Sequence, residues 1–369
     1  MALRLLIFII LLLNVSCIDL YEADLGKQNK VLVVEGLLTD DVIKPDTIKI
    51  QYSTDLGNQV KIEPIVSVKA LIAIASSGKE IRLIEYETGK FLPPANFKAI
   101  PNEKYSLKFT LPNGEQYEST PELLTPSPPI TNIYEKFNPK SRISDNGKKF
   151  LSANEVFIDF KDTPQEKNYY LWRYILFEKL QHCITCYAPE LYGFNEERCI
   201  LASRSIDLDP PYLDYNCLTQ CFAILKGKDS PVFSDRESDG NAVLGRIVAK
   251  IPNYYSTGCL VEIQQICISK QVYDFYQLLE AGTKSNGDLV DVPPTSIVGN
   301  IKNINNAQEK IVGVFGLVQI SKKRIWIDRK DANGDFALIL GHPIREGKMP
   351  LAVCKEGATR TRIKPEGWQ

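Results

Sequence analysis

The cysteines are the residues of this sequence whose number and spacing allow the most chemistry. Nine occur among the 369 residues. Cys17 stands alone near the start, and seven of the other eight fall within residues 183–267. An even number suits complete pairing in disulfides, and the eight candidates are Cys183, Cys186, Cys199, Cys217, Cys221, Cys259, Cys267 and Cys354.

Two pairs of these cysteines also match a metal site. Cys183-x-x-Cys186 followed by Cys217-x-x-x-Cys221 has the spacing of a zinc knuckle. Disulfides form in oxidising compartments and are rare in reducing ones, where such spacing more often indicates a metal. The choice between the two therefore depends on where the chain resides.

Oxygen ligands offer a weaker metal candidate. Asp235-x-Glu237-x-Asp239-Gly240 begins like a calcium loop, with acidic residues at alternate positions and glycine at the sixth. An EF-hand closes with a carboxylate at the twelfth position, where this sequence has Arg246. An acidic turn is therefore the favoured interpretation, and Asp235, Glu237 and Asp239 remain weak calcium candidates.

Histidine, the usual general base, occurs only twice, as His182 and His342. Neither has a recognisable catalytic companion, and the sequence contains no nucleophile elbow and no HExxH motif. His182 precedes Cys183, whereas a haem attachment motif places histidine after its second cysteine. The sequence therefore predicts no catalytic residue, no cofactor and no enzymatic activity.

Residues 1–17 have the layout of a secretory signal. Arg4 supplies a positive charge, and Leu5 to Leu13 form an apolar run too short to span a bilayer. Cys17 stands where a lipoprotein box has its acylated cysteine, although Asn14 replaces the usual leucine three residues earlier. We expect a lipoprotein signal peptide ending at Cys17, palmitate on this cysteine, and an acidic tether over residues 18–29. An ordinary signal peptide is the alternative.

Export would place the mature chain in an oxidising compartment, which favours disulfides over zinc. No second apolar run reaches membrane-spanning length, so attachment to the membrane is expected through lipid alone. ATP and NAD, which are cytosolic cofactors, become poor candidates for a ligand. Lys and Arg number 44 against 45 Asp and Glu, so no net positive charge is available to attract nucleic acid.

The elements that position these residues are mainly strands. Residues 31–36, 47–52, 66–75, 105–111 and 115–120 are apolar or alternate with period two, and Asn113-Gly114 suits a hairpin turn. Short strands separated by turn signals predict an immunoglobulin-like β-sandwich over residues 30–126. Prolines at 121, 126, 128 and 129 mark its end, because proline cannot continue a sheet.

A β-rich C-terminal domain with one clear helix is predicted over residues 127–369. Its strands are expected at 155–160, 168–174, 242–251 and 260–268, with a final strand pair at 312–320 and 323–328. The helix is predicted over residues 269–280, where Val272, Phe275, Tyr276 and Leu279 follow helical spacing. A Cys-rich insertion occupies residues 179–267, and within it residues 179–235 have little periodic structure. A loop region clamped by disulfides is therefore expected there.

Several short motifs, taken in order, resemble one known family. They are Val31-Leu32-Val33-Val34-Glu35-Gly36, Asn168-Tyr169-Tyr170, Val272-Tyr273-Asp274-Phe275-Tyr276, Pro293-Pro294-Thr295-Ser296-Ile297-Val298-Gly299-Asn300-Ile301, Gly313-Val314-Phe315-Gly316 and Lys364-Pro365-Glu366-Gly367-Trp368. This series resembles the Bacteroidetes lipoprotein family catalogued as domain of unknown function 4249. The resemblance implies an outer-membrane lipoprotein often encoded beside TonB-dependent transporters, and it supplies no catalytic residues to carry over.

The leading functional hypothesis is a surface-exposed outer-membrane lipoprotein, anchored by lipid and facing the cell exterior. It would be a ligand-binding or docking accessory of a TonB-dependent nutrient transporter, with a ligand that the sequence does not name. A structural or adhesive envelope protein without a small ligand is the first alternative. A carboxylate-based hydrolase is the second, and a pair of Asp or Glu side chains in a sugar-sized cleft would favour it.

Overall fold

The computed structural model describes residues 30–39, 47–55, 60–144, 147–164, 167–202, 211–284, 299–332 and 351–369. The predicted signal peptide, Cys17, the tether and His342 lie outside these residues. The described chain is mainly β, as predicted, and it contains one α-helix. None of the described helices combines the length and apolar character needed to cross a bilayer.

The first body of the molecule consists of two facing sheets. One sheet has the strand order β23 (Val312–Val318), β1 (Lys30–Thr39), β2 (Ile48–Asp55), β7 (Lys90–Leu92) and β6 (Ile84–Glu87), with β3 (Val60–Pro64) beside β2. The other has the order β22 (Ile301–Asn303), β9 (Gln116–Ser119), β8 (Lys104–Thr110), β4 (Lys69–Ile74) and β5 (Glu80–Arg82), with β10 (Glu122–Leu123) beside β8. The predicted sandwich is present, and its immunoglobulin-like topology stays a prediction.

Alternation along the strands builds the core between these sheets. Leu32 and Val34 of β1 point into it, as do Ile48 and Ile50 of β2, and all four side chains are buried. Successive residues of a strand face opposite sides, so every second side chain reaches the same core. From the opposite sheet, Leu107 packs against the same cluster.

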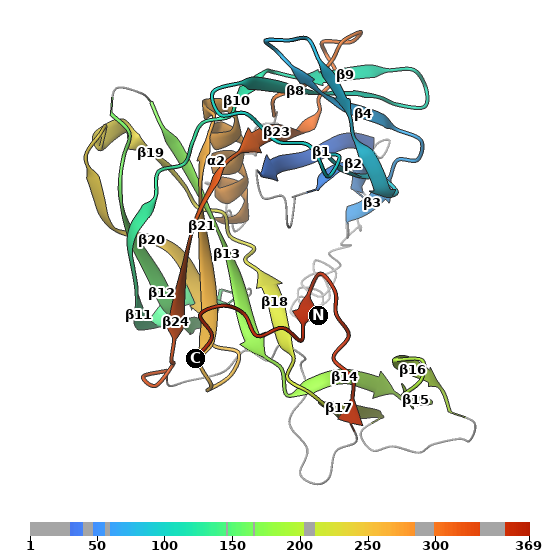
Figure 1. The fold of residues 1–369 in the computed structure, drawn as a ribbon, viewed down its shortest axis with the longest axis vertical. Helices are drawn as coiled ribbons and strands as arrows, with labels where there is room; N and C mark the ends of the chain where they lie inside the picture. Colours follow the sequence, from blue (N-terminus) through green and yellow to red (C-terminus); the bar gives the residue numbers. More distant parts are fainter. Residues whose placement is uncertain are drawn as a thin grey trace, which may run out of the picture.

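The predicted domain boundary after residue 126 does not separate the two bodies. Residues 301–303 and 312–318 return from the C-terminal half and supply edge strands to the first sandwich (Figure 1). Strand β23 runs parallel to β1, with Val33 opposite Val312. Gly313 takes a φ of 139° there, and a Cβ on it would lie 1.8 Å from the Val34 carbonyl oxygen, so only glycine allows this approach. Residues 127–369 are therefore not one contiguous domain.

The second body is also a pair of packed sheets. One is formed by β11 (Ile130–Ile143), β12 (Phe150–Lys161) and β20 (Ala242–Pro252). The other has the order β24 (Ile320–Ile327), β21 (Cys259–Ile268), β13 (Tyr169–Lys179), β18 (Phe222–Lys226) and β26 (Arg360–Thr361), with β19 (Val232–Ser234) beside β13. All residues of β21 are buried, because neighbours cover both of its faces. The predicted pairing of residues 312–320 with 323–328 is wrong, since β24 pairs with β21.

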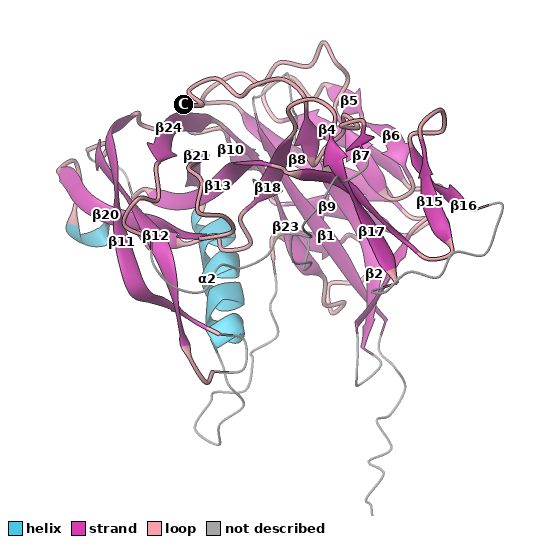
Figure 2. Ribbon diagram, turned by 90° about the horizontal axis from the view of Figure 1, so that it is seen from below, coloured by secondary structure: helices cyan, strands magenta, loops and turns pink. Residues whose placement is uncertain are grey.

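Helix α2 (Lys270–Lys284) joins the two sandwiches, as Figure 2 shows. The predicted helix over residues 269–280 is confirmed, and the Ser269 hydroxyl accepts a hydrogen bond of 3.3 Å from the Val272 N–H. Val272 and Phe275 lie in one buried cluster with Leu37 of β1, Val314 of β23 and residues of β13 and β21. One face of α2 therefore packs against both bodies.

The stretch predicted as a loop over residues 179–235 contains six short strands. Besides β18 and β19 these are β14 (His182–Tyr187), β15 (Glu190–Gly193), β16 (Arg198–Leu201) and β17 (Tyr212–Cys217). Strand β25 (Leu351–Ala352) adds to β17, and a single 3-10 turn, η1 (Asp235–Glu237), follows β19. The strands are too short for a clear period in the sequence, so the expected loop is corrected here to a small β unit.

Candidate functional site

Three disulfides hold this small β unit together. Cys183–Cys217 joins β14 to β17, Cys186–Cys199 joins β14 to β16, and Cys221–Cys354 joins the residue before β18 to the segment that follows β25. These bonds close segments with sequence separations of 34, 13 and 133 residues. We call residues 180–202, 211–221 and 351–354 the disulfide-clamped unit.

The prediction that all eight cysteines are paired is wrong. Cys259 and Cys267 are buried thiols outside the three disulfides. They lie eight positions apart on β21, which separates their backbones by about 26 Å at the rise of an extended strand. A disulfide requires Cα atoms within about 7 Å, so the two cannot bridge each other.

The sulfur atoms of Cys183, Cys221 and Cys354 lie within 4.8 Å of one another, and only Cys183 and Cys221 belong to the knuckle that the sequence suggested. All three belong to disulfides, whereas zinc binds thiolates. The oxidised unit therefore does not fit the zinc alternative. His182 is buried beside Cys183, and neither of its ring nitrogens has a hydrogen-bond partner among the described residues.

Exposed apolar side chains are a feature of the disulfide-clamped unit that the sequence did not predict. The unit projects from the lower end of β13 and β18 in Figure 1. Leu201 is the most exposed of these side chains, at 73%. The others are Tyr187, Phe194, Leu218 and Leu351. The inner side of the unit packs around the cysteines and Tyr215, so its outer side is held in a fixed shape.

The calcium candidates occupy a turn with structural partners. Asp235 starts η1, and its buried carboxylate accepts a hydrogen bond of 2.6 Å from the Asn168 N–H. Burial raises the pKa of Asp235. Asp239 is exposed, and the side chain of Glu237 lies outside the described part of the chain. Within that part, neither Asp235 nor Asp239 belongs to a group of three potential metal ligands.

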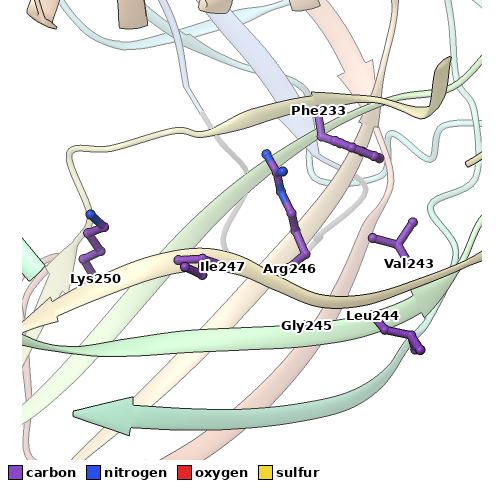
Figure 3. Close-up of a pocket in the computed structure, with 7 residues that line it drawn as sticks. All are labelled: Phe233, Val243, Leu244, Gly245, Arg246, Ile247 and Lys250. Atoms are coloured by element: carbon purple, nitrogen blue, oxygen red, sulfur yellow. The ribbon is translucent and has the colours of Figure 1, made fainter. Parts of the chain in front are cut away.

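A cavity of about 560 Å³ opens beside β20, and sequence reasoning did not find it (Figure 3). Its lining combines a guanidinium and an ammonium with apolar side chains: Phe233, Val243, Leu244, Gly245, Arg246, Ile247 and Lys250. Burial lowers the pKa of Arg246 from its ordinary value. The only sequence signal was a lone arginine among the apolar residues of a predicted strand.

A second cavity, of about 400 Å³, has acidic residues where a carboxylate-based hydrolase would need them, and Glu135, Asp328 and Asp331 line it. The Lys330 ammonium lies 2.8 Å from Asp328 and lowers the pKa of that carboxyl. A general acid needs a raised pKa instead. Glu178 does have a pKa raised to about 7 by burial, but its side chain is fully buried and paired with Arg329.

Comparison with known families matches most of the chain. A family described as Domain of unknown function (DUF4249) matches residues 18–324. No curated protein matches, and no solved structure matches. The matched range begins directly after Cys17 and covers strands of both sandwiches, helix α2 and strands β14–β17 of the disulfide-clamped unit.

Proposed function

The chain belongs to the family described as Domain of unknown function (DUF4249), and from this premise we propose that it is a surface-exposed outer-membrane lipoprotein that docks on a TonB-dependent transporter. Cys17 would carry the lipid, and the two sandwiches would form a rigid body. The disulfide-clamped unit would contact the transporter.

The exposed apolar side chains of the disulfide-clamped unit carry this proposal. Leu201, Phe194 and Tyr187 are each more than half exposed, on a unit whose backbone three disulfides constrain. Aromatic and apolar side chains held on a rigid frame provide the central contacts of protein interfaces at low entropic cost. Scattered apolar residues are ordinary on protein surfaces, but five of them on so small a unit favour a partner.

Replacement of Leu201 by Asp tests the docking surface. Because a charge there would lose its hydration on contact, Leu201→Asp should reduce the amount of co-purified transporter by about tenfold or more. The measurement is quantitative mass spectrometry of the tagged lipoprotein purified in mild detergent. Ile84→Asp is the matched control, since Ile84 is 54% exposed and lies on β6, in the first sandwich.

A purification in which no transporter accompanies the wild-type protein would contradict the docking proposal. The structural or adhesive envelope protein would then become the better hypothesis. Equal recovery of a transporter with Leu201→Asp and with Ile84→Asp would support a transporter partner. It would show that the surface around Leu201 does not contact that partner.

Replacement of Cys17 by Ser tests the anchor. Without its thiol the chain cannot be acylated, so Cys17→Ser should leave the membrane fraction and carry no labelled palmitate. The control is the same substitution at another cysteine. Cys259→Ser removes a buried thiol of β21 and should remain in the membrane fraction. Membrane-bound, palmitate-labelled Cys17→Ser would show that the anchor lies elsewhere.

A further inference from the structure

Arg246 has a guanidinium most of whose hydrogen-bond donors find no acceptor among the described residues. Its Cζ atom lies 4.8 Å from the centre of the Phe233 ring and 5.7 Å from that of Trp172. Its Nη2 donates one long hydrogen bond, of 3.5 Å, to the Val232 carbonyl oxygen. Its Nε is buried and has no partner among the described residues.

No carboxylate within the described chain forms an ion pair with Arg246. Glu280 and Tyr273 of helix α2 act on its charge only through space. A buried donor without an acceptor costs free energy, and the half-buried charge of Arg246 adds to this cost because no described carboxylate pairs with it. The stacked rings offset part of this cost, because a cation is attracted to an aromatic face. An anion that reached the guanidinium would supply the missing acceptors.

A β-bulge in β20 sets the direction of the Arg246 side chain. Between the pairs Phe160–Val243 and Ile158–Arg246, Leu244 and Gly245 both oppose Asp159. Gly245 has a φ of 64°, and its N–H donates a 2.7 Å hydrogen bond to the Asp159 carboxylate, which fixes the bulge. Bulges redirect the side chains that follow them. The position of Arg246 is therefore built into β20.

The rings beside Arg246 are fixed as well. Trp172 is fully buried, and its indole N–H donates a 3.0 Å hydrogen bond to the side chain of Gln265. Phe233 lies on β19, which is paired with β13, the strand of Trp172. An anion would thus meet a guanidinium already held in place, so little rotamer freedom would be lost on binding.

The rest of the cavity is apolar next to Arg246. Figure 3 shows the guanidinium beside Phe233, with Val243 on the same side of β20, whereas Leu244 points away from it on the other side of the strand. Phe233 and Val243 are both half-buried, so each still offers apolar surface to a ligand. Lys250 lies beyond Ile247 in this view, and its ammonium donates a 2.7 Å hydrogen bond to the Ser141 carbonyl oxygen.

We propose that this cavity binds a small carboxylate with an apolar body, the carboxylate on Arg246 and the body on Phe233 and Val243. A guanidinium presents parallel N–H donors that match the two oxygens of a carboxylate. The Lys250 ammonium is engaged by the Ser141 carbonyl oxygen, so the guanidinium is the cation that faces the ligand. It balances the single charge of a carboxylate better than the nearly double charge of a phosphate monoester. The site is independent of the docking surface, because none of its residues belongs to the disulfide-clamped unit.

Calorimetric titration of the full mature chain with octanoate tests the proposal. Wild-type protein should bind octanoate with saturation, and octanamide, which has the same body without the charge, should bind at least about tenfold more weakly. Arg246→Met keeps the stacked alkyl stem and removes the charge, so it should lose octanoate binding by the same factor. Arg236→Met is the matched control, because Arg236 is exposed on η1 and does not line the cavity.

A second variant separates lost binding from lost folding. Val243→Ser leaves Arg246 in place, and it should weaken octanoate several-fold while leaving the much weaker binding of acetate unchanged. No saturable binding of octanoate up to millimolar concentration would overturn the proposal, as would equal affinity in Arg246→Met. Tighter binding of octyl phosphate than of octanoate would replace the carboxylate by a phosphate ligand.

Discussion

At the scale of single residues, the second sandwich contains a fully buried pair of charges that serves structure. The guanidinium of Arg329 lies 2.5 and 3.1 Å from the two carboxylate oxygens of Glu178, and both side chains have no exposure. Arg329 also donates to the carbonyl oxygens of Pro252, Tyr255 and Thr257. Removing one partner of such a pair leaves the other charge uncompensated, which costs far more than the loss of an exposed pair.

Arg329→Met should therefore destabilise the protein by about 3–5 kcal/mol at pH 8. Burial raises the pKa of Glu178 to about 7, so its contribution to stability is fully present below its ordinary value near 4.5 and is lost as pH rises through 7. Below pH 5 Glu178 is neutral with or without Arg329, and the penalty of Arg329→Met should shrink. Urea denaturation at pH 5 and pH 8 measures both quantities.

The control for this prediction is Arg324→Met. Arg324 makes an ion pair of 2.8 Å with Glu262, but its side chain is 33% exposed, so water can replace much of the interaction. We expect its loss to cost about 1 kcal/mol or less. A penalty for Arg329→Met as small as that of Arg324→Met, or one that does not change with pH, would contradict the account of the buried pair.

At the scale of elements, the disulfide-clamped unit compensates for short strands with covalent bonds. Its strands β14, β15, β16 and β17 have six, four, four and six residues. Strands of this length, in sheets of two or three, are marginal in water. Each disulfide contributes about 2–4 kcal/mol, chiefly by restricting the unfolded chain. The cysteines therefore determine whether this element is ordered.

The structure of this element can be tested through the oxidation state of each cysteine. Alkylation of the denatured, unreduced protein should label Cys259 and Cys267 and leave the six cysteines of the three disulfides unlabelled. Peptide mass spectrometry identifies the labelled sites, and a fully reduced sample should show label on all eight. Label on Cys186 or Cys199 in the unreduced sample would refute the assigned pairing.

At the scale of the whole molecule, the two sandwiches are joined by packing as well as by the chain. Helix α2 buries Val272 and Phe275 between sheets that belong to different bodies. The chain also crosses between the bodies more than once, because β21 lies in the second, β22 and β23 in the first, and β24 in the second again. Such an arrangement couples the unfolding of one body to that of the other.

Phe275→Ala should destabilise both bodies together. Truncation of a buried phenylalanine removes its transfer free energy and leaves a cavity, with a cost of about 3–5 kcal/mol. Tryptophan fluorescence reports the second body, because Trp172, Trp326 and Trp368 all lie there, and hydrogen exchange of β1 and β8 reports the first. Both signals should move to lower urea concentration.

Leu278→Ala, on the same helix, provides the comparison, since Leu278 is 37% exposed and should cost about 1 kcal/mol or less. A shift of the second body alone in Phe275→Ala would show that α2 does not couple the two.

The sequence by itself determined the local properties of this protein. Apolar runs or period-two alternation predicted β1, β8 and β21, and helical spacing predicted α2. These predictions succeed because each depends on side chains within a few residues of one another. The family resemblance is confirmed as well, since it rests on short motifs in a constant order.

Only the tertiary structure decided which of these elements meet. An apolar strand such as β23 can satisfy its backbone against any open edge, so nothing within residues 312–318 shows that its partner is β1, nearly 280 residues earlier. The pairing of Cys221 with Cys354 depends on the same long-range choice. Arg246 is a candidate ligand-binding residue only because β19 and β13 bring two aromatic rings beside it, while no described carboxylate forms an ion pair with it. Pairing and exposure are properties of the folded surface, and the spacing of residues along the chain does not contain them.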